Sequence, residues 1–456
     1  MVSAKKNKDK FPISSDFKQI NPRAAGIDIG SDVHYVAVSP ELTDEPVKNF
    51  GCYTPDLHEM ARWLKGYNVE TVMMESTGVY WIPVFQVLKG HGFDVNLVDA
   101  RHVSSVPGRD TDVGASQWIQ KLHSYGLLRS CYLPEAEMVP LREYWRYRAE
   151  LVEMASKQIL LMQKALEQMN LQLHKALSDI TGVTGMSILR AIIAGERNPS
   201  ILAKMRNNSV KKSEDEIEKA LTGDWRDEQL YMLKAAVDLF DFAQAKMAEC
   251  DQKIEECVRT FEDKFESDKQ APKPNNRKQR KNQPHFDLQS ELFRMTGVDL
   301  TAIDGISSIT ALTVISECGI DLNAFATEKH FSSWLGLCPH NMITGGKVRK
   351  RKTRKVQSRT AKALRLAAQS LHNSKTALGA FYRRMKYKLG PAKATTATAH
   401  KLACLIFRMI RYGMDYVDKG QEIYNQQYQE RVLKNLHKQA EAMGFGIVEL
   451  STGQVS

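Results

Sequence analysis

Residues 24–127 alternate short runs of strand-forming residues with segments of helical spacing, and this order leaves few folds open. The expected elements, in chain order, are strands at 25–29, 33–38 and 47–53, a helix at 56–64, a strand at 69–74, a helix at 81–88, a strand at 93–98 and a helix at 112–127. Three strands followed by alternating helices and strands predict an α/β domain with a mixed sheet. We place this domain at residues 22–130, after a basic N-terminal tail at 1–21.

The middle of the chain, residues 131–268, has a different periodicity. Apolar side chains there step by threes and fours in two long series, as they do in helices that pair along a seam. The first series is Val152, Ala155, Ile159, Met162, Leu166, Met169, Leu173 and Ala176, and the second is Ala236, Phe240, Ala243, Met247, Cys250, Ile254, Cys257 and Phe261. We expect an α-helical coiled-coil domain, formed either as an antiparallel hairpin or by pairing with another subunit.

The rest of the chain divides by composition. Residues 269–285 are rich in Lys, Asn and Pro without apolar periodicity, which predicts a basic linker. A helical pattern then resumes from Leu288 to about Lys434, so we expect a mainly α domain at 286–420 and a C-terminal tail at 421–456. Gly305 and Ser307 lie at the start of this domain in a segment that resembles a helix-hairpin-helix turn, whose backbone amides can meet a phosphate. The alternative is an ordinary helix connection.

Positive charge is concentrated in one part of the chain. The net charge of +11 comes from 64 Lys and Arg against 53 Asp and Glu. The 86 residues from Lys329 to Met414 contain 20 of these cations and no acidic residue, so the remaining 370 residues have a net charge of −9. A cationic module beside a mildly acidic remainder indicates a polyanionic partner, and nucleic acid is the first candidate. A solvated, solubilising face would usually mix both signs.

The cysteine content and the hydropathy narrow the cellular setting. The chain has seven cysteines and no Cys-x-x-Cys pair, which is typical of a reduced cytosolic protein rather than of a disulfide framework. No run of 18 apolar residues occurs, and the charged first ten residues do not resemble a signal peptide. We expect a cytoplasmic, nucleoid-associated protein of bacterial type that does not enter a membrane.

Three acidic residues stand at matching places in the expected α/β domain. Asp28 closes the first strand, Glu75 closes the fourth, and Asp112 begins the helix after the last strand. In this RNase H-like element order, strand ends lie side by side, so the carboxylates can converge and bind divalent metal between them. We therefore predict a Mg²⁺ site of Asp28, Glu75 and Asp112 that serves phosphodiester cleavage. Taken singly, each residue would be read as a turn or cap.

A second group of candidates is basic. Thr344 precedes Gly345, Gly346 and Lys347, and a run of cations follows. Adjacent glycines allow a close approach of the backbone to a ligand, and Lys and Arg side chains contact phosphates. The predicted nucleic-acid contacts are Gly345, Gly346, Lys347, Arg349, Lys350, Arg351, Lys352, Arg354 and Lys355, with Gly305 and Ser307 from the helix-hairpin-helix-like turn. The hydroxyl group of Thr344 could act as a nucleophile, or it could simply belong to a turn.

Four motifs together resemble the insertion-sequence-110 family of DEDD transposases, most closely its insertion-sequence-1111 branch. They are Ala25-Gly-Ile-Asp-Ile-Gly30, Met74-Glu-Ser-Thr-Gly78, Gly108-Arg-Asp-Thr-Asp-Val113 with Gln117-Trp118, and the segment from Gly336 to Lys347. The resemblance implies a RuvC-like N-terminal domain that binds Mg²⁺, a coiled coil and a C-terminal transposase domain with a hydroxyl nucleophile. It also implies recombination of DNA guided by an element-encoded structured RNA, by dimers or tetramers whose active site is completed between chains.

The sequence departs from the family pattern at two positions. The fourth acidic position falls on Ala115, three residues after Asp112, and alanine cannot bind metal. Either the natural protein has lost this ligand or the chain carries an inactivating change, and we expect weak cleavage or none. The nucleophile position holds Thr344 where the family typically has serine, with Ser358 as the other candidate.

Two other functions compete with the RNA-guided recombinase. A metal-dependent nuclease of the junction-resolvase type would use the acidic site alone, and it would leave the Thr344 motif and the basic module without a role. A non-catalytic nucleic-acid-binding relative is compatible with Ala115.

Overall fold

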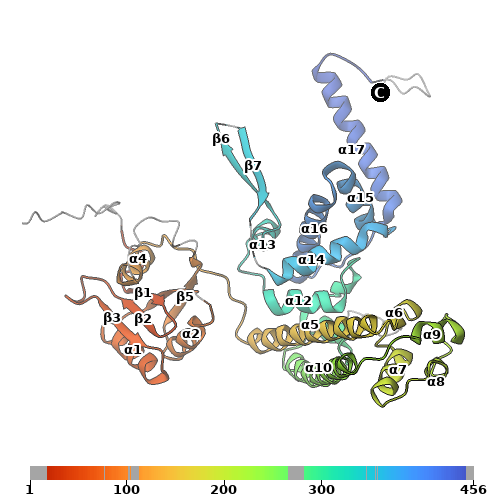
Figure 1. Cartoon of the computed structure of the whole chain (residues 1–456). Helices are drawn as coiled ribbons and strands as arrows, with labels where there is room; N and C mark the ends of the chain where they lie inside the picture. Colours follow the sequence, from red (N-terminus) through yellow and green to blue (C-terminus); the bar gives the residue numbers. More distant parts are fainter. Residues whose placement is uncertain are drawn as a thin grey trace, which may run out of the picture. The chain divides into compact units, whose positions relative to one another are not determined.

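The computed structural model describes residues 18–76, 78–100, 103, 112–264, 282–345, 347–354, 356 and 358–447. The chain forms two compact units, residues 1–133 and 134–456 (Figure 1). Most of the predicted linker and most of the N-terminal tail lie outside the described residues. Within the described part of the chain, no helix combines the length and the apolar character that crossing a membrane requires.

The first unit is built on a five-stranded mixed sheet of order β3-β2-β1-β4-β5. Its elements are β1 (Ala24–Ile29), β2 (Val33–Ala37), β3 (Val47–Gly51), α1 (Thr54–Gly66), β4 (Thr71–Glu75), α2 (Trp81–Gly90), β5 (Asp94–Val98) and α4 (Asp112–Ser124). The first three strands are antiparallel neighbours, whereas β4 runs parallel to both β1 and β5. The predicted α/β domain with a mixed sheet is confirmed, and the strand and helix bounds agree closely with those expected from the sequence.

The two faces of this sheet are covered by different helices. On one face, alternate strand residues such as Ile27, Val36 and Met74 pack with buried side chains of α1 and α2. On the other face, Met73 and Val98 form a smaller core with Ile119 of α4. Both layers bury strand residues, which explains why the sequence of β1 shows a continuous buried run rather than an alternating pattern.

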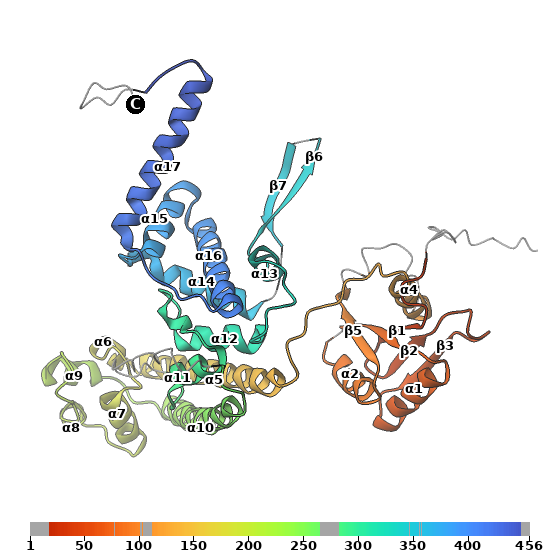
Figure 2. The same ribbon diagram turned by 180° about the vertical axis from the view of Figure 1, so that it is seen from behind.

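The second unit begins with two long helices, α5 (Met138–Gln168) and α10 (Asp227–Arg259), which pack side by side (Figures 1 and 2). They are antiparallel, because Arg148 near the start of α5 pairs with Asp251 near the end of α10, while the amide of Asp224 donates to the Met169 carbonyl at 2.8 Å. The antiparallel hairpin foreseen from the sequence is therefore formed within one chain. A regular coiled-coil geometry stays a prediction.

A buried ion pair fastens these helices. The guanidinium of Arg148 donates from Nε and Nη2 to the two carboxylate oxygens of Asp251, and both side chains are almost fully buried. Nη1 of Arg148 also donates to the Asn282 carbonyl at 3.1 Å. The apolar heptad series did not predict this ion pair. A paired and hydrogen-bonded charge can nevertheless replace an apolar residue between two packed helices.

A group of shorter helices lies between α5 and α10 in the sequence. These are α6 (Leu173–Ala176), α7 (Val183–Ile193), α8 (Pro199–Ala203) and α9 (Glu214–Leu221). Gly182 is the N-cap of α7, and a Cβ on Gly185 would stand 2.1 Å from the Ile180 carbonyl oxygen, so the close packing at this helix start requires glycine.

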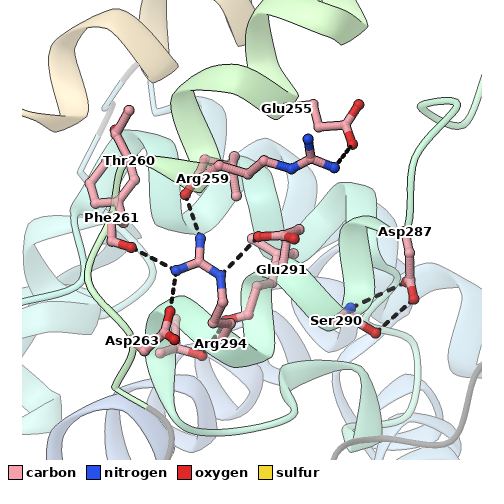
Figure 3. Close-up of polar contacts among 12 residues, drawn as sticks. Glu255, Arg259, Thr260, Phe261, Asp263, Asp287, Ser290, Glu291 and Arg294 are labelled. Carbon is pink, nitrogen blue, oxygen red and sulfur yellow. Dashed lines mark hydrogen bonds and ion pairs between the residues drawn. The ribbon is translucent and has the colours of Figure 1, made fainter.

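Arg294 joins the end of α10 to α11 (Leu288–Thr296), as Figure 3 shows. Its guanidinium donates to the carbonyls of Val258 and Phe261, at 2.7 and 2.6 Å, and to the carboxylates of Asp263 and Glu291. These bonds satisfy carbonyls at a helix C-terminus with a cation, which is the favourable charge for that end. The two helices are thus held together although residues 260–287 separate them in the chain.

The remaining elements form the C-terminal part of the second unit. They are η1 (Leu300–Ala302), α12 (Ser308–Cys318), α13 (Glu328–Trp334), β6 (Pro339–Thr344), β7 (Lys347–Thr353), α14 (Arg359–Ser370), η2 (Leu371–Asn373), α15 (Ala377–Leu389), α16 (Pro391–Tyr412) and α17 (Gly420–Ala442). One expectation needs correction, because residues 339–353 form an antiparallel hairpin rather than a helix. The helix α17 continues the expected helical pattern into the segment that we placed in the C-terminal tail.

Candidate active site

Asp28 and Glu75 lie side by side at the ends of two parallel strands. The pairing of β1 with β4 runs from Ala24 opposite Thr71 to Ile27 opposite Met74, and the same offset of 47 residues brings Asp28 opposite Glu75. Residues in register on neighbouring strands point to the same face of a sheet. The two carboxylates therefore share the face covered by α4, where Asp28 is 8% exposed and Glu75 is 5% exposed.

The helix α4 approaches this face more closely than side chains normally permit. A Cβ atom on Gly26 would stand 2.2 Å from the Gln120 amide nitrogen and 2.5 Å from the Ser116 carbonyl oxygen. The side-chain amide of Gln120 also donates to the Ala24 carbonyl at 3.3 Å. The absence of a side chain at Gly26 is what allows this contact.

These contacts also fix the direction of α4 over β1. Ile20 and Asn21, which precede β1, donate their amides to the Ser124 carbonyl at the end of α4, whereas Gly26 lies against Ser116 and Gln120. Going back along α4 therefore corresponds to going forward along β1. One helical turn spans about 5.4 Å and two strand residues about 6.6 Å. The next turn of α4, where Asp112 begins the helix, consequently lies toward the end of β1 that carries Asp28. The side chain of Asp112 is outside the described part of the structure.

Ala115 is fully buried at the start of α4. Ile119, one turn further along the same helix, packs in the core that contains Met73 and Val98 of β4 and β5. Residue 115 therefore faces the sheet, and Glu75 lies two residues beyond Met73 on the same face. An acidic side chain at position 115 would be directed toward the ends of these strands, whereas alanine contributes only a methyl group.

The pairing of β1 with β2 adds one residue that the sequence did not single out. Tyr35 stands directly opposite Asp28, on the side away from Glu75. Its ring therefore lies on the same face and flanks the acidic pair. The sequence did hold a signal for Tyr35. The link between β1 and β2 is only Gly30 to Asp32, and such a short link fixes which residues of the two strands stand opposite each other.

Two carboxylates on adjacent strands supply the hard oxygen ligands that a divalent cation such as Mg²⁺ binds. The described side chains do not include a group of three potential metal ligands, and Asp112 is not among those described. Asp28 and Glu75 fit as half of a metal site, with the start of α4 as the element that completes it.

Thr344 lies at the tip of the β6–β7 hairpin. It pairs with Lys347, so the connection consists of Gly345 and Gly346, and Gly345 adopts a left-handed conformation with φ +56°. Thr344, Gly345 and Lys347 are all exposed. A two-residue turn with positive φ is the normal connection of a tight hairpin, and it explains the glycine pair.

The cations that follow Thr344 lie along β7 and just beyond it. Arg349 is exposed, and Arg354 donates to the Ser333 carbonyl at 2.6 Å, which ties the base of the hairpin to α13. The side chains of Lys350, Arg351 and Lys352, and the whole of Gly346 and Lys355, lie outside the described residues. Lys347 and Arg349 stand two residues apart on β7, so these two exposed cations share one side of the strand.

The other predicted residues in this unit have structural roles. The hydroxyl of Ser358 accepts from the Ala361 amide at 3.1 Å and so caps α14. Ser307 caps α12 in the same way, through the Thr310 amide. Gly305 has φ +85°, and a Cβ there would stand 2.9 Å from the Ala367 carbonyl oxygen, so close packing against α14 requires glycine. Whether these residues also contact nucleic acid stays a prediction.

Two family models match this sequence. A model of insertion-sequence-110 DEDD transposases, described as "Transposase", matches residues 25–171. A second, described as "Transposase IS116/IS110/IS902 family", matches residues 299–383. A comparison with curated proteins gave no match. The first region contains Asp28, Glu75 and Asp112, and the second contains Thr344 and the hairpin. The resemblance predicted from the four motifs is confirmed over both regions.

Proposed function

We propose that this chain, which resembles the insertion-sequence-110 transposases in both matched regions, is a site-specific DNA recombinase guided by a structured RNA. The two matches support a transposase or recombinase function. The RNA guide, the assembly into dimers or tetramers and the residue roles below are part of the proposal. The observation that carries it is the placement of Asp28 beside Glu75 under the start of α4.

The acidic pair would hold Mg²⁺. Asp28 and Glu75 supply oxygen ligands from the sheet, and Asp112 would add a third from α4. Such an ion stabilises negative charge on a phosphodiester that is being cleaved. The close packing of α4 against Gly26 would fix the position of Asp112 relative to the strand ends, because a rigid helix holds the residues that it carries.

Thr344 would be the nucleophile. Its hydroxyl oxygen forms a bond to a DNA phosphorus while the bond from that phosphorus to a deoxyribose oxygen breaks, so the protein becomes covalently attached to one strand. The departing oxygen takes up a proton and the threonine hydroxyl loses one. The exposed hairpin tip leaves the hydroxyl accessible, and Lys347 opposite it adds positive charge where the phosphate would lie.

Ala115 would leave the chain impaired in cleavage. The position faces the acidic strand ends and is fully buried, so an aspartate there would be a ligand rather than a solvated surface group. We expect nucleic-acid binding without efficient cutting.

Restoring the acid tests this mechanism. We expect Ala115→Asp, given its RNA, substrate DNA and Mg²⁺, to form a protein–DNA adduct that peptide mapping places on Thr344. The matched variant, Ala115→Asp with Thr344→Val, keeps the shape of the side chain and lacks the hydroxyl, so it should form none.

The outcomes separate the three candidate functions. Strand breaks without an adduct in both variants would favour the metal-dependent nuclease and refute the role of Thr344. An adduct mapped to Ser358 would move the nucleophile to the start of α14. If neither variant cuts DNA although both bind it, the non-catalytic relative is the correct description.

A further inference from the structure

Three helices meet around a group of cations and aromatic rings in the second unit. Arg384 belongs to α15, Lys401 to α16 and Arg431 to α17, and the rings are those of Phe381, Tyr424 and Tyr428. We call these six residues the α15–α17 cluster. Both views show the three helices gathered at this end of the chain (Figures 1 and 2). All but Phe381 lie outside the two regions matched by the family models.

The cations lie against the faces of the rings. The guanidinium carbon of Arg384 is 4.0 Å from the centre of the Tyr428 ring and 5.0 Å from that of Tyr424. The ammonium nitrogen of Lys401 is 4.7 Å from the centre of the Phe381 ring and 5.6 Å from that of Tyr424. Contacts of this kind attract a cation to an aromatic face, but they leave its full charge in place.

The positive charges in the cluster are not balanced. Burial lowers the pKa of the Lys401 ammonium, and the nearby guanidinium groups of Arg384 and Arg431 lower it further. In the described part of the chain, none of the three cations forms an ion pair with a carboxylate. Nε of Arg384 is shielded from solvent and has no hydrogen-bond partner among those residues. Like charges that are partly removed from water repel one another unless an anion joins them.

A purely structural role accounts for only part of this arrangement. Cation–π contacts would help to seat α17, which has no fully buried residue, against α15 and α16. Arg384 and Lys401 already make these contacts. Arg431 takes part in none of the cation–π contacts of the described residues, and its charge adds repulsion to that of Lys401. Nε of Arg384 also has no hydrogen-bond acceptor there.

The tyrosines indicate which anion fits. Tyr428 is 40% exposed although Arg384 lies over its ring, so part of the ring remains open to a ligand. Aromatic rings interleaved with cations are the usual means of binding unpaired nucleic acid, in which bases stack on the rings and phosphates meet the cations. A free inorganic anion would contact the cations but would not stack on the rings.

We propose that the α15–α17 cluster binds an unpaired stretch of nucleic acid, with a phosphate held by Arg384, Lys401 and Arg431 and a base stacked on Tyr428. This site rests on the proposed function only in that its ligand is a nucleic acid. RNA and DNA share the phosphodiester group, and the experiment below distinguishes them. This site would bind the nucleic-acid strand at a place separate from the β6–β7 hairpin and from the acidic pair.

Amine footprinting of the full-length chain tests the site without a mutation. Acetic anhydride acetylates accessible lysine amines, and peptide mapping quantifies the label at Lys401 and at Lys388. We expect a single-stranded oligonucleotide to abolish labelling at Lys401 and to leave exposed Lys388 at the end of α15 labelled as before. Parallel arms with RNA and DNA of the same sequence, and with the corresponding duplex, identify the form that protects.

Each result decides something. Protection by single strands supports the site, and its restriction to one arm assigns RNA or DNA. Protection by the duplex alone overturns the unpaired ligand and the stacking role of Tyr428. Binding, followed by fluorescence anisotropy, without protection of Lys401 refutes the site and leaves the proposed function standing, whereas failure to bind any of the oligonucleotides refutes both.

A pair of charge-matched variants gives an independent measurement. Loss of one phosphate contact lowers the slope of log affinity against log salt concentration by about 0.7 for a single strand. We expect that loss for Lys401→Gln and a smaller one for Lys388→Gln, with circular dichroism melts to confirm folding. Equal salt-dependence slopes for the two variants would mean that nucleic acid is attracted by the general positive charge of this region rather than by a specific site at Lys401.

Discussion

Replacing Gly26 by alanine should displace α4 from the sheet. The new Cβ would lie 2.2 Å from the Gln120 amide nitrogen, whereas ordinary van der Waals contact begins at 3.4 Å. The two nearest atoms belong to the backbone of α4, so no flexible side chain can move away. The helix must therefore shift by about 1 Å, or the strand must bend by a similar amount.

The magnitude follows from this overlap. Overpacking of a well-filled interior costs about 1–3 kcal/mol, and because the clash is with backbone we expect the upper end of that range. The free energy of unfolding of the first unit should fall accordingly. In the Ala115→Asp background, the displacement also moves Asp112 relative to Asp28, and an error of about 1 Å at reacting groups lowers the rate roughly a hundredfold.

The matched control is Gly90→Ala in α2. Nothing lies within 4 Å of the Cβ that would be added there, and the residue is helical. Alanine should leave the first unit unchanged or stabilise it by up to about 1 kcal/mol, because glycine disfavours the helix. Urea unfolding, combined with hydrogen exchange of peptides from β1 and α4, measures both variants. If Gly26→Ala unfolds like the control and its α4 peptides exchange no faster, the close seat of α4 is refuted.

Two further changes test the packing of the units. Arg148→Met leaves Asp251 buried and unpaired, so we expect the second unit to lose about 3–5 kcal/mol of its free energy of unfolding in urea. The control, Arg190→Met, removes an exposed ion pair and should cost less than about 1 kcal/mol. Equal losses in the two variants would refute the special role of the buried pair. Burial lowers the pKa of His34 in the folded protein. As the pH falls below about 6.5, the unfolded chain therefore takes up a proton at this histidine before the folded protein does. The first unit should consequently lose free energy of unfolding below that pH. Urea midpoints measured between pH 7.5 and 5 (conditions chosen to span about one unit on either side of that value) should fall less steeply for His34→Leu than for the unchanged chain, and an unaltered slope would contradict this assignment.

The elements of the first unit could be predicted because each one carries its own local signal. Buried strands read as apolar runs, helices read as apolar residues at threes and fours, and the eight expected elements all occur. The antiparallel pairing of α5 with α10 was foreseen as one of two options for the same reason. Only the seam position of Arg148 and Asp251 was missed, because a charged residue interrupts an apolar series without revealing its partner.

The β6–β7 hairpin was missed because the sequence of its strands lacks the apolar and polar alternation of a half-buried strand. Lys347–Thr353 is almost entirely basic, so the composition indicated charge and concealed the strand. The remaining signal was the glycine pair after Thr344, which forms the two-residue turn of a tight hairpin. Helix α17 was foreseen in part, because the helical pattern was followed to about Lys434, whereas the helix continues to Ala442 and buries no residue completely.

The sequence by itself determined which chemistry is present: the acids at strand ends, the hydroxyl before two glycines and the cationic module. Periodicity and residue type are local properties, and they can be read without knowing which segments meet. The tertiary structure decided what lies next to what. It set Asp28 opposite Glu75 and Tyr35, turned residue 115 toward the sheet, and gathered Arg384, Lys401 and Arg431 from three helices. Such neighbours depend on strand register and on the close seat of one helix, and these arise only when distant segments pack together.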